Sequence, residues 1–180
     1  MLAKPEMCRP CPLWGDGQGF VPDRLVEGAP VLVLAQGPGE DEERGMHVTG
    51  YVGHDPLYAP CEPQPLIGRT GWWWERHLLP RTGLTREQVS LANVLRCRWG
   101  RQDAKGRWKK VNELPPAAIL EKASEHCMAT YFRIPTGTRL VVACGALAHL
   151  VTRGVADSVT EAAGSLAGGD VAKGDPPGRG

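Results

Sequence analysis

Residues 30–43 read PVLVLAQGPGEDEE, and this stretch decides the expected fold. Its first part, residues 31–35, is a short apolar run rich in valine and leucine, which is typical of a buried strand. The run stops at Gly37-Pro38-Gly39, which predicts a tight loop, and four consecutive acids follow. Because open α/β sheets bind ligands at the carboxyl ends of their strands, the stretch predicts a binding site. The alternative is a plain connection between two elements.

The rest of the chain supplies the partners for this strand. Further strands are predicted over residues 89–95 and 139–144. Helices are predicted over about residues 72–79, 114–132 and 146–151, and Pro80 is expected to end the first of them. This alternation predicts an α/β fold of three layers, α/β/α, around a central, mostly parallel sheet. Three tryptophans in a row at residues 72–74 place at least one ring near the surface, because consecutive helical residues point about 100° apart.

The expected domain spans residues 1–150. Residues 14–28 are predicted to be loop because glycines and a proline interrupt any period. An inserted surface loop is predicted at residues 44–64, where Gly, His, Tyr and Pro show no apolar pattern. Residues 151–180 form a glycine-rich tail without a convincing strand, and we expect this tail to be an incomplete or irregular end of the same domain.

Composition limits the class of protein. The chain has 180 residues, 42% of them hydrophobic and 23% charged, which argues against wholesale disorder. No apolar run approaches a membrane span and the N-terminus lacks the apolar core of a signal peptide, so we expect a cytoplasmic monomer that does not bind membranes. The net charge is only +1, so any affinity for nucleic acid must come from a local patch.

Residues 96–110 form such a patch. They contain seven Arg or Lys, one acid and two tryptophans. Cations interleaved with aromatic rings suit contacts to phosphates and stacking on bases, whereas a solvated loop is the alternative. The candidate DNA-binding cations of this segment are Arg98, Arg101, Arg107 and Lys110.

The chain has six cysteines and no secretion signal, which favours metal ligands or buried thiols over disulfides. Four of them lie where one metal centre would draw them together: Cys8 and Cys11 as a CxxC pair, and Cys97 and Cys127 as single residues. A zinc ribbon uses two close pairs, so this pattern favours a 4Fe-4S cluster held by four thiolates and leaves zinc as the alternative. Cys144 is expected in the core, and Cys61 has no assigned partner.

Taken in order, these motifs resemble those of the iron-sulfur (family 4) uracil-DNA glycosylases. The shared strings are the CxxC at residues 8–11, AQGPG at 35–39, PLIGRTG at 65–71, NVLRCR at 93–98, Cys127 and CGALA at 144–148. The similarity covers about residues 8–150. It implies the uracil-DNA glycosylase fold, a structural 4Fe-4S cluster, and hydrolysis of the N-glycosidic bond of uracil, or of a related deaminated base, in DNA.

The resemblance also implies roles for residues of the pocket. Gln36 and Gly37 occupy the Glu and Ala positions of the family's Gly-Glu-Ala-Pro-Gly loop, which lines the uracil pocket. Leu66 stands where the family has a phenylalanine that packs on the flipped base. Asn93 matches the asparagine whose amide reads the edge of uracil.

Two further groups of residues follow from the resemblance. An acid shortly after the first loop helps the catalytic water, and Glu42 is the candidate here, with Asp41 as its neighbour. Contacts to DNA are expected from the two glycine-framed loops, at Pro38, Gly39, Gly68, Arg69 and Thr70.

The chain departs from the family at three points. Gln36 replaces a carboxylate, Leu66 replaces an aromatic ring, and the chain has no His-Pro pair, whose histidine stabilises the departing uracil anion in the family. The last histidine, His149, is expected to be a packed or surface residue. We therefore expect a chain that is truncated or ends in an unrelated tail. A catalytically inactive iron-sulfur DNA-binding module is the alternative to the enzyme.

Overall fold

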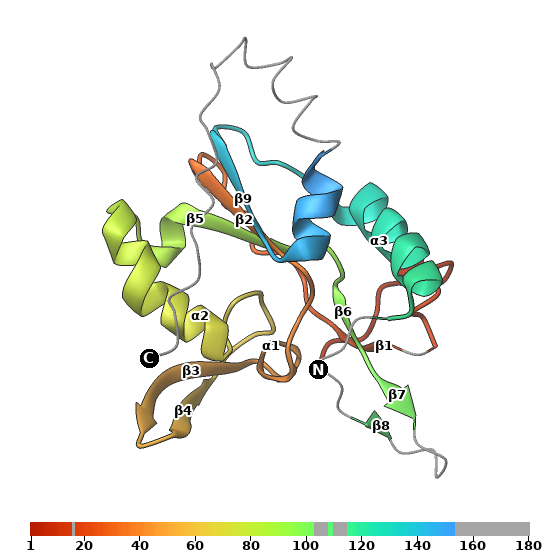
Figure 1. Cartoon of the computed structure of the whole chain (residues 1–180), viewed down its shortest axis with the longest axis horizontal. Helices are drawn as coiled ribbons and strands as arrows, with labels where there is room; N and C mark the ends of the chain where they lie inside the picture. The colour runs from red at the N-terminus through yellow and green to blue at the C-terminus, as the bar shows by residue number, and fades with distance from the viewer. Residues whose placement is uncertain (16, 103–107, 110–114, 154–180) are drawn as a thin grey trace, which may run out of the picture.

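A computed structural model describes residues 1–15, 17–102, 108–109 and 115–153. Its centre is a parallel sheet of β2 (Val31–Ala35), β5 (Val89–Asn93) and β9 (Leu140–Cys144), in the order β5-β2-β9 (Figure 1). The predicted α/β fold around a parallel sheet is confirmed. The register aligns the last residues of the three strands, so the carboxyl ends meet at one edge of the sheet.

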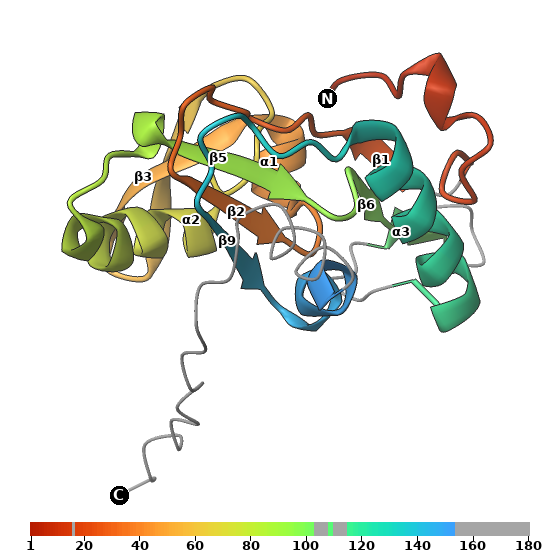
Figure 2. The same ribbon diagram turned by 90° about the horizontal axis from the view of Figure 1, so that it is seen from above.

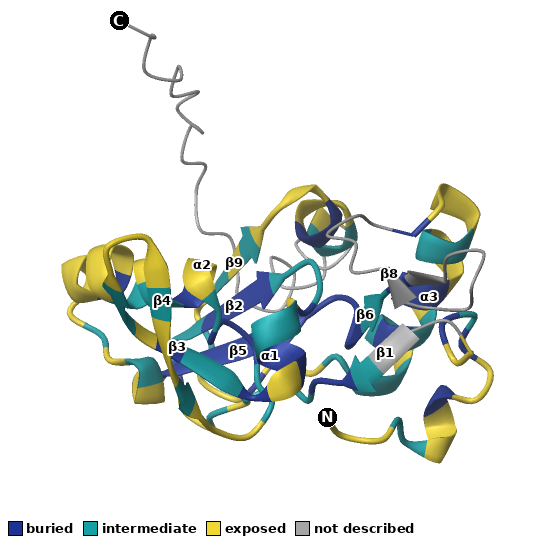
Figure 3. Ribbon diagram, turned by 90° about the horizontal axis from the view of Figure 1, so that it is seen from below, coloured by how far each residue is buried: buried dark blue, intermediate teal, exposed yellow. Residues whose placement is uncertain are grey.

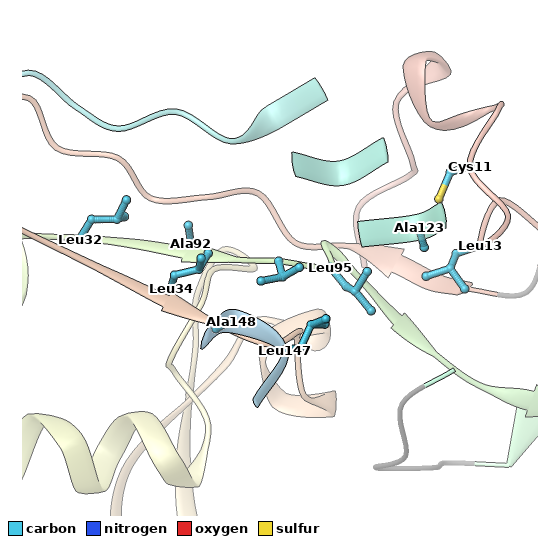
Figure 4. Close-up of a cluster of buried hydrophobic side chains, with 10 residues drawn as sticks. Cys11, Leu13, Leu32, Leu34, Ala92, Leu95, Ala123, Leu147 and Ala148 are labelled. Carbon is cyan, nitrogen blue, oxygen red and sulfur yellow. The ribbon is translucent and has the colours of Figure 1, made fainter. Parts of the chain in front are cut away.

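Helices cover both faces of this sheet. Leu32 and Leu34 point to one face and pack in a core with Ala123 of α3 (Ala117–Tyr131) and with Leu147, which lies in a helix over residues 146–153 (Figures 2 and 4). Val33 points to the other face, and the cluster there includes Leu66 and Leu79. The alternation of side chains along β2 therefore builds three layers, because successive residues of a strand point to opposite faces.

The helical segment on the second face is longer than predicted. It runs as α2 (Arg69–Trp73), a π-helical turn (Trp74–Leu78) and a 3₁₀ turn (Leu79–Thr82). Pro80 does not end the helix, because it lies in the first turn of the 3₁₀ segment, where its missing N–H group is tolerated. Trp73 is exposed, as predicted for one of the three adjacent tryptophans.

Two predicted loops are regular structure. The four acids lie in a short helix, α1 (Glu40–Arg44), and the insertion is an antiparallel hairpin of β3 (Met46–Val52) and β4 (Asp55–Pro60). β4 pairs with β3 alone among the described strands, which is where a strand tolerates prolines. The hairpin leaves much of its surface exposed (Figure 3), and this explains why its composition carries no apolar period.

The remaining described elements are short. β1 (Gly17–Phe20) lies within the predicted loop of residues 14–28 and pairs with β6 (Cys97–Trp99). Further along the chain, β7 (Arg101–Gln102) pairs with β8 (Trp108–Lys109). Two 3₁₀ turns, Glu6–Cys8 and Arg86–Gln88, precede β1 and β5. In the described part of the chain, no helix is long and apolar enough to cross a membrane.

The start of α2 depends on a glycine. An ideal Cβ atom on Gly71 would lie 1.9 Å from the carbonyl oxygen of Leu66. We expect Gly71→Ala to lower the free energy of unfolding by about 1–3 kcal/mol, the usual cost of overpacking, because the residue 66 carbonyl must move. Urea denaturation measures this loss. Gly15→Ala, where the added methyl group meets no atom within 4 Å, is the control. Equal stability of the two variants would contradict the packing described here.

Candidate active site

A cavity of about 1210 Å³ opens at the carboxyl ends of β2 and β9. It is lined by residues of the first loop, of α1 and of the second glycine-framed loop. Of the residues singled out from the sequence, the cavity wall includes Gln36, Gly37, Pro38, Gly39, Asp41, Glu42, Leu66, Gly68, Arg69, Thr70 and Arg98. Segments that are far apart in the sequence therefore meet around one hollow, as the positions of the motifs predicted.

Glu42 connects the two glycine-framed loops. Its carboxylate accepts hydrogen bonds from the backbone N–H groups of Gly39 (3.1 Å) and Leu66 (2.7 Å). Burial raises the pKa of Glu42 to about 7, although these bonds and the nearby Arg86 act to lower it. Glu42 therefore holds the pocket walls together and changes charge near neutral pH.

Leu66 adopts an unusual backbone conformation at the wall of the cavity. Its φ angle is +57°, in the left-handed region that favours glycine. Arg86 stabilises this conformation, because its guanidinium group donates hydrogen bonds to the carbonyl oxygens of Leu66 (2.8 Å) and Pro65 (2.7 Å) and pairs with Glu75. Arg86 was not predicted as a site residue, and nothing in the local sequence distinguishes it from a surface arginine.

Asn93 ends β5 next to Glu42, is 1% exposed and is not itself a lining residue of the cavity. Its side chain lies near enough to Glu42 to help lower the pKa of that residue, after the larger effects of burial and the backbone bonds. Neither Nδ2 nor Oδ1 of Asn93, however, has a hydrogen-bond partner of proper geometry among the described residues. Burying an unpaired amide is costly, so these two atoms are available to a polar partner.

Gln36 lines the cavity but also supports a neighbouring helix. Its Oε1 atom accepts a hydrogen bond from the N–H group of Leu147 (3.1 Å) in the first turn of the helix over residues 146–153. Gly145, with φ +99°, passes so close that a Cβ atom there would lie 2.6 Å from Gln36. The acceptor oxygen of Gln36 is thus already used within the protein.

Arg98 lines the cavity with its charge already paired. Its guanidinium group lies 3.0 Å from Glu43 and 3.7 Å from Glu40, and the side chain is 12% exposed. Glu43, which is 1% exposed, also accepts a hydrogen bond from the N–H group of Gly19 in β1. Contact of Arg98 with DNA stays a prediction, and the structure adds a second role in joining α1 to β1 and β6.

The structure says less about the other cations that were predicted to bind DNA. Arg101 lies in β7, whereas Arg107 and Lys110 lie outside the described residues. The tail after residue 153 lies outside them as well. His149 is a surface residue, as expected.

The structure brings the four predicted metal ligands together. Cys8, Cys11, Cys97 and Cys127 are all buried, and each of the six pairs among them is close enough for one thiol to affect the pKa of the other. Burial raises the pKa of Cys97 to about 12, whereas a hydrogen bond with Cys127 lowers that of Cys11. No three Cys, His, Asp or Glu side chains converge on a single-ion site within the described ranges.

Apolar side chains surround these thiols. Cys8 and Cys97 pack with Phe20, while Cys11 packs in the main core near Ala123 of α3 (Figure 4). Tyr131 closes the group, because its hydroxyl group lies 2.9 Å from the Cys8 sulfur. Four thiols in a dry, shared environment are a donor set that fits a four-thiolate centre.

A buried ion pair links this thiol group to the pocket. Arg96, 1% exposed, pairs with Asp23, donates a hydrogen bond to the carbonyl oxygen of Cys127 (3.1 Å) and lies 5.0 Å from the Tyr131 ring centre. Asp23 in turn accepts a bond from the N–H group of Asn93 (3.4 Å). The sequence showed Arg96 only as one of several cations, and nothing in it identified Asp23 as a partner.

Cys144 corrects one prediction. It was expected in the core, but it is exposed and lines the cavity at the end of β9. The reason is that only one face of β9 packs against the main core, through Val141 and Ala143, whereas the face that carries Cys144 is exposed. Cys61 is exposed as well, at the foot of the hairpin.

The raised pKa of Glu42 predicts a dependence of stability on pH. The folded protein holds this proton more tightly than the unfolded chain, whose glutamate has the ordinary value of 4.5. The resulting stabilisation is complete below about pH 4.5 and is lost as the pH rises through about 7, by about 3 kcal/mol at most.

Urea denaturation at pH 5 and pH 8 tests this dependence. We expect the free energy of unfolding of Glu42→Gln to change less between the two pH values than that of the wild type. The control is Glu125→Gln, a change at an exposed position on α3. Identical pH dependence of wild type and Glu42→Gln would contradict the assigned burial.

Comparison with known proteins finds a distant similarity. The chain is 26% identical over 91 residues to the type-4 uracil-DNA glycosylase of Sulfurisphaera tokodaii. The match covers 51% of this chain and 34% of the relative, so the chain spans about a third of the length of the protein it matches. No protein-family profile matches the chain. The chain is thus distantly similar to a type-4 uracil-DNA glycosylase, and its α/β fold is compatible with that similarity.

Proposed function

We propose that this chain is a DNA repair glycosylase that hydrolyses the N-glycosidic bond of uracil, or of a related deaminated base, in DNA. The observation that carries the proposal is Asn93, whose buried amide at the carboxyl end of β5 has no hydrogen-bond partner of proper geometry among the described residues. An amide offers one donor group and one acceptor atom side by side. Uracil presents the complementary pair, a carbonyl oxygen and a ring N–H, on its edge.

The base would enter the cavity after extrusion from the helix, since its reactive bond cannot be reached within stacked DNA. Leu66 would form an apolar wall against the base in place of an aromatic ring. Gly37 is suited to bind a base carbonyl oxygen through its N–H group, because Pro38 has none and that of Gly39 is used by Glu42.

The two carboxylates have different environments and would act differently. Glu42 is buried and bonded to both loops, so it would act through the negative charge that it carries above its pKa of about 7, which favours a cationic sugar. Asp41 is partly exposed in the cavity wall, where it can position water. The oxygen of that water would form the new bond to the sugar carbon and pass a proton to the Asp41 carboxylate. The N-glycosidic bond would break and leave its electron pair on the base, which then takes up a proton from solvent.

The four buried cysteines would hold a 4Fe-4S cluster, with zinc as the alternative. Bound there, the cluster supplies a crosslink between the N-terminal segment, β6 and α3, and requires no redox step. The contacts from Cys127 through Arg96 and Asp23 to Asn93 would then keep the base-reading amide in place.

A catalytically inactive DNA-binding module of the same fold is the second candidate. It is favoured by Gln36, whose acceptor oxygen supports a helix instead of facing the base, and by the absence of a His-Pro pair from the sequence.

An excision assay on an end-labelled oligonucleotide with one uracil separates the two candidates. The enzyme leaves an abasic site that alkali cleaves, and the thymine-containing oligonucleotide stays intact. Binding of the uracil oligonucleotide without cleavage supports the inactive module. If the protein neither binds nor cleaves the uracil oligonucleotide, both candidates are wrong.

A further inference from the structure

The mouth of the cavity carries two exposed aromatic rings. Tyr58 on β4 is 40% exposed and Trp73 on α2 is 49% exposed, and both line the cavity. Exposed apolar side chains that are scattered singly are normal, whereas exposed rings gathered at one opening are typical of an interaction site. The hairpin insertion and the tryptophan run therefore converge on the same opening, although the pocket roles assigned above use neither.

The neighbouring tryptophans show that the position of Trp73 is built into the fold. Trp72 packs edge-on against Tyr51 of β3, with ring centres 4.8 Å apart. Trp74 packs against the apolar cluster under the sheet. These two contacts fix α2 between the hairpin and the sheet, and the ring between them is left at the surface, where it lies 5.5 Å from the ring of His77.

The charge beside the rings suits a nucleic acid. Partial burial raises the pKa of Tyr58, and Asp41 and Arg69 act on it in opposite directions, so Arg69 lies next to this ring. Arg69 is exposed at the same cavity wall. A cation alongside aromatic rings is the combination that binds single strands, because the bases stack on the rings while the cation meets a phosphate.

The size of the cavity leaves room for this contact. Its volume of about 1210 Å³ exceeds the roughly 300–1,000 Å³ of a pocket for a drug-sized ligand, so one base does not fill it.

We propose that Tyr58 and Trp73 form a stacking subsite for the bases of single-stranded DNA next to the nucleotide held in the pocket. The inference rests on the proposed DNA glycosylase function and gives the hairpin insertion a role in it. Single strands are favoured over duplex, because the bases of a duplex are already stacked on one another.

Fluorescence anisotropy with a labelled, uracil-free oligonucleotide, single-stranded and as a duplex, tests the subsite. Tyr58→Ala and Trp73→Ala should each weaken single-strand binding by roughly tenfold and duplex binding by less than about twofold. Tyr58→Phe and Trp73→Phe, which keep a ring, should bind nearly as the wild type does. Leu57→Ala, at an exposed residue of β4 outside the cavity wall, should have no effect.

Melting temperatures of all variants show whether they are folded. Alanine variants that bind single strands as tightly as the wild type would overturn the inference, and so would equal losses for single strands and duplex. Uracil excision by the wild type, measured in parallel, separates the subsite from the proposed function. If the wild type excises uracil and the alanine variants bind DNA as it does, only the subsite is wrong. If the wild type neither binds nor cleaves DNA, the proposed function is wrong as well.

Discussion

Replacing Asn93 with leucine is expected to slow uracil release by about 10²–10³-fold, the usual cost of losing one catalytic hydrogen-bond donor. The variant should nevertheless be as stable as the wild type or more stable. The reason is that neither polar atom of the buried amide has a hydrogen-bond partner of proper geometry within the described part of the chain, so their removal takes away an unpaired polar group that costs about 1–3 kcal/mol. Single-turnover excision and urea denaturation of the same sample measure the two effects.

Ser90→Ala on the same strand is the matched control. The Ser90 hydroxyl group accepts a hydrogen bond from the N–H group of Val26 (2.9 Å) at the far end of β5 from the cavity. Its removal should lower stability by about 1–3 kcal/mol and leave the excision rate unchanged. If Asn93→Leu lost stability and kept its activity, Asn93 would be a structural residue and the assignment of base reading would be wrong.

The second large effect is expected at the cysteines. Replacing any one of Cys8, Cys11, Cys97 and Cys127 with serine should remove most of the bound iron. The free energy of unfolding should fall by at least about 4 kcal/mol, as is typical when a structural metal is lost. The four residues come from three separate segments, so one lost ligand loosens contacts between the N-terminal segment, β6 and α3.

The chain supplies its own controls for this series. Cys61→Ser and Cys144→Ser change exposed thiols outside the buried group, and should leave iron content and melting temperature unchanged. Iron and sulfide analysis with a visible absorption spectrum, after anaerobic purification, gives the result. Iron loss from the two control variants, or its retention by the four serine variants, would show that the ligands have been assigned wrongly.

The central sheet could be predicted because its signal is local. The apolar run of β2 and the glycines after it mark a strand and a loop by themselves, and the spacing of the following elements implies parallel order. The hairpin could not be predicted, because most positions of β3 and β4 are half-buried or exposed and β4 contains prolines, so no apolar period marks them. Its position near the pocket depends on packing between Tyr51 and Trp72.

The candidate site was predictable in its residue types but not in its contacts. Asn93 and Glu42 were identified through the resemblance of their motifs to those of the family 4 uracil-DNA glycosylases. The pair of Arg96 with Asp23, and the support of Leu66 by Arg86, join residues that are distant in the chain. Such pairs leave no spacing or composition signal, so tertiary structure alone identifies them. Cys144 was misplaced for a related reason, since the sequence of β9 does not show which of its two faces packs against the core.

The most direct test of the account follows uracil release as a function of iron content in one anaerobic preparation. Fractions from metal-free to fully loaded protein are assayed for iron and for free uracil released from DNA. We expect the rate of uracil release to rise in proportion to the iron content of the fraction, up to four irons per chain. Full activity in iron-free protein would contradict the proposed link between the cysteine group and the pocket. No release from fully loaded protein that still binds DNA would contradict the enzyme and leave the inactive module.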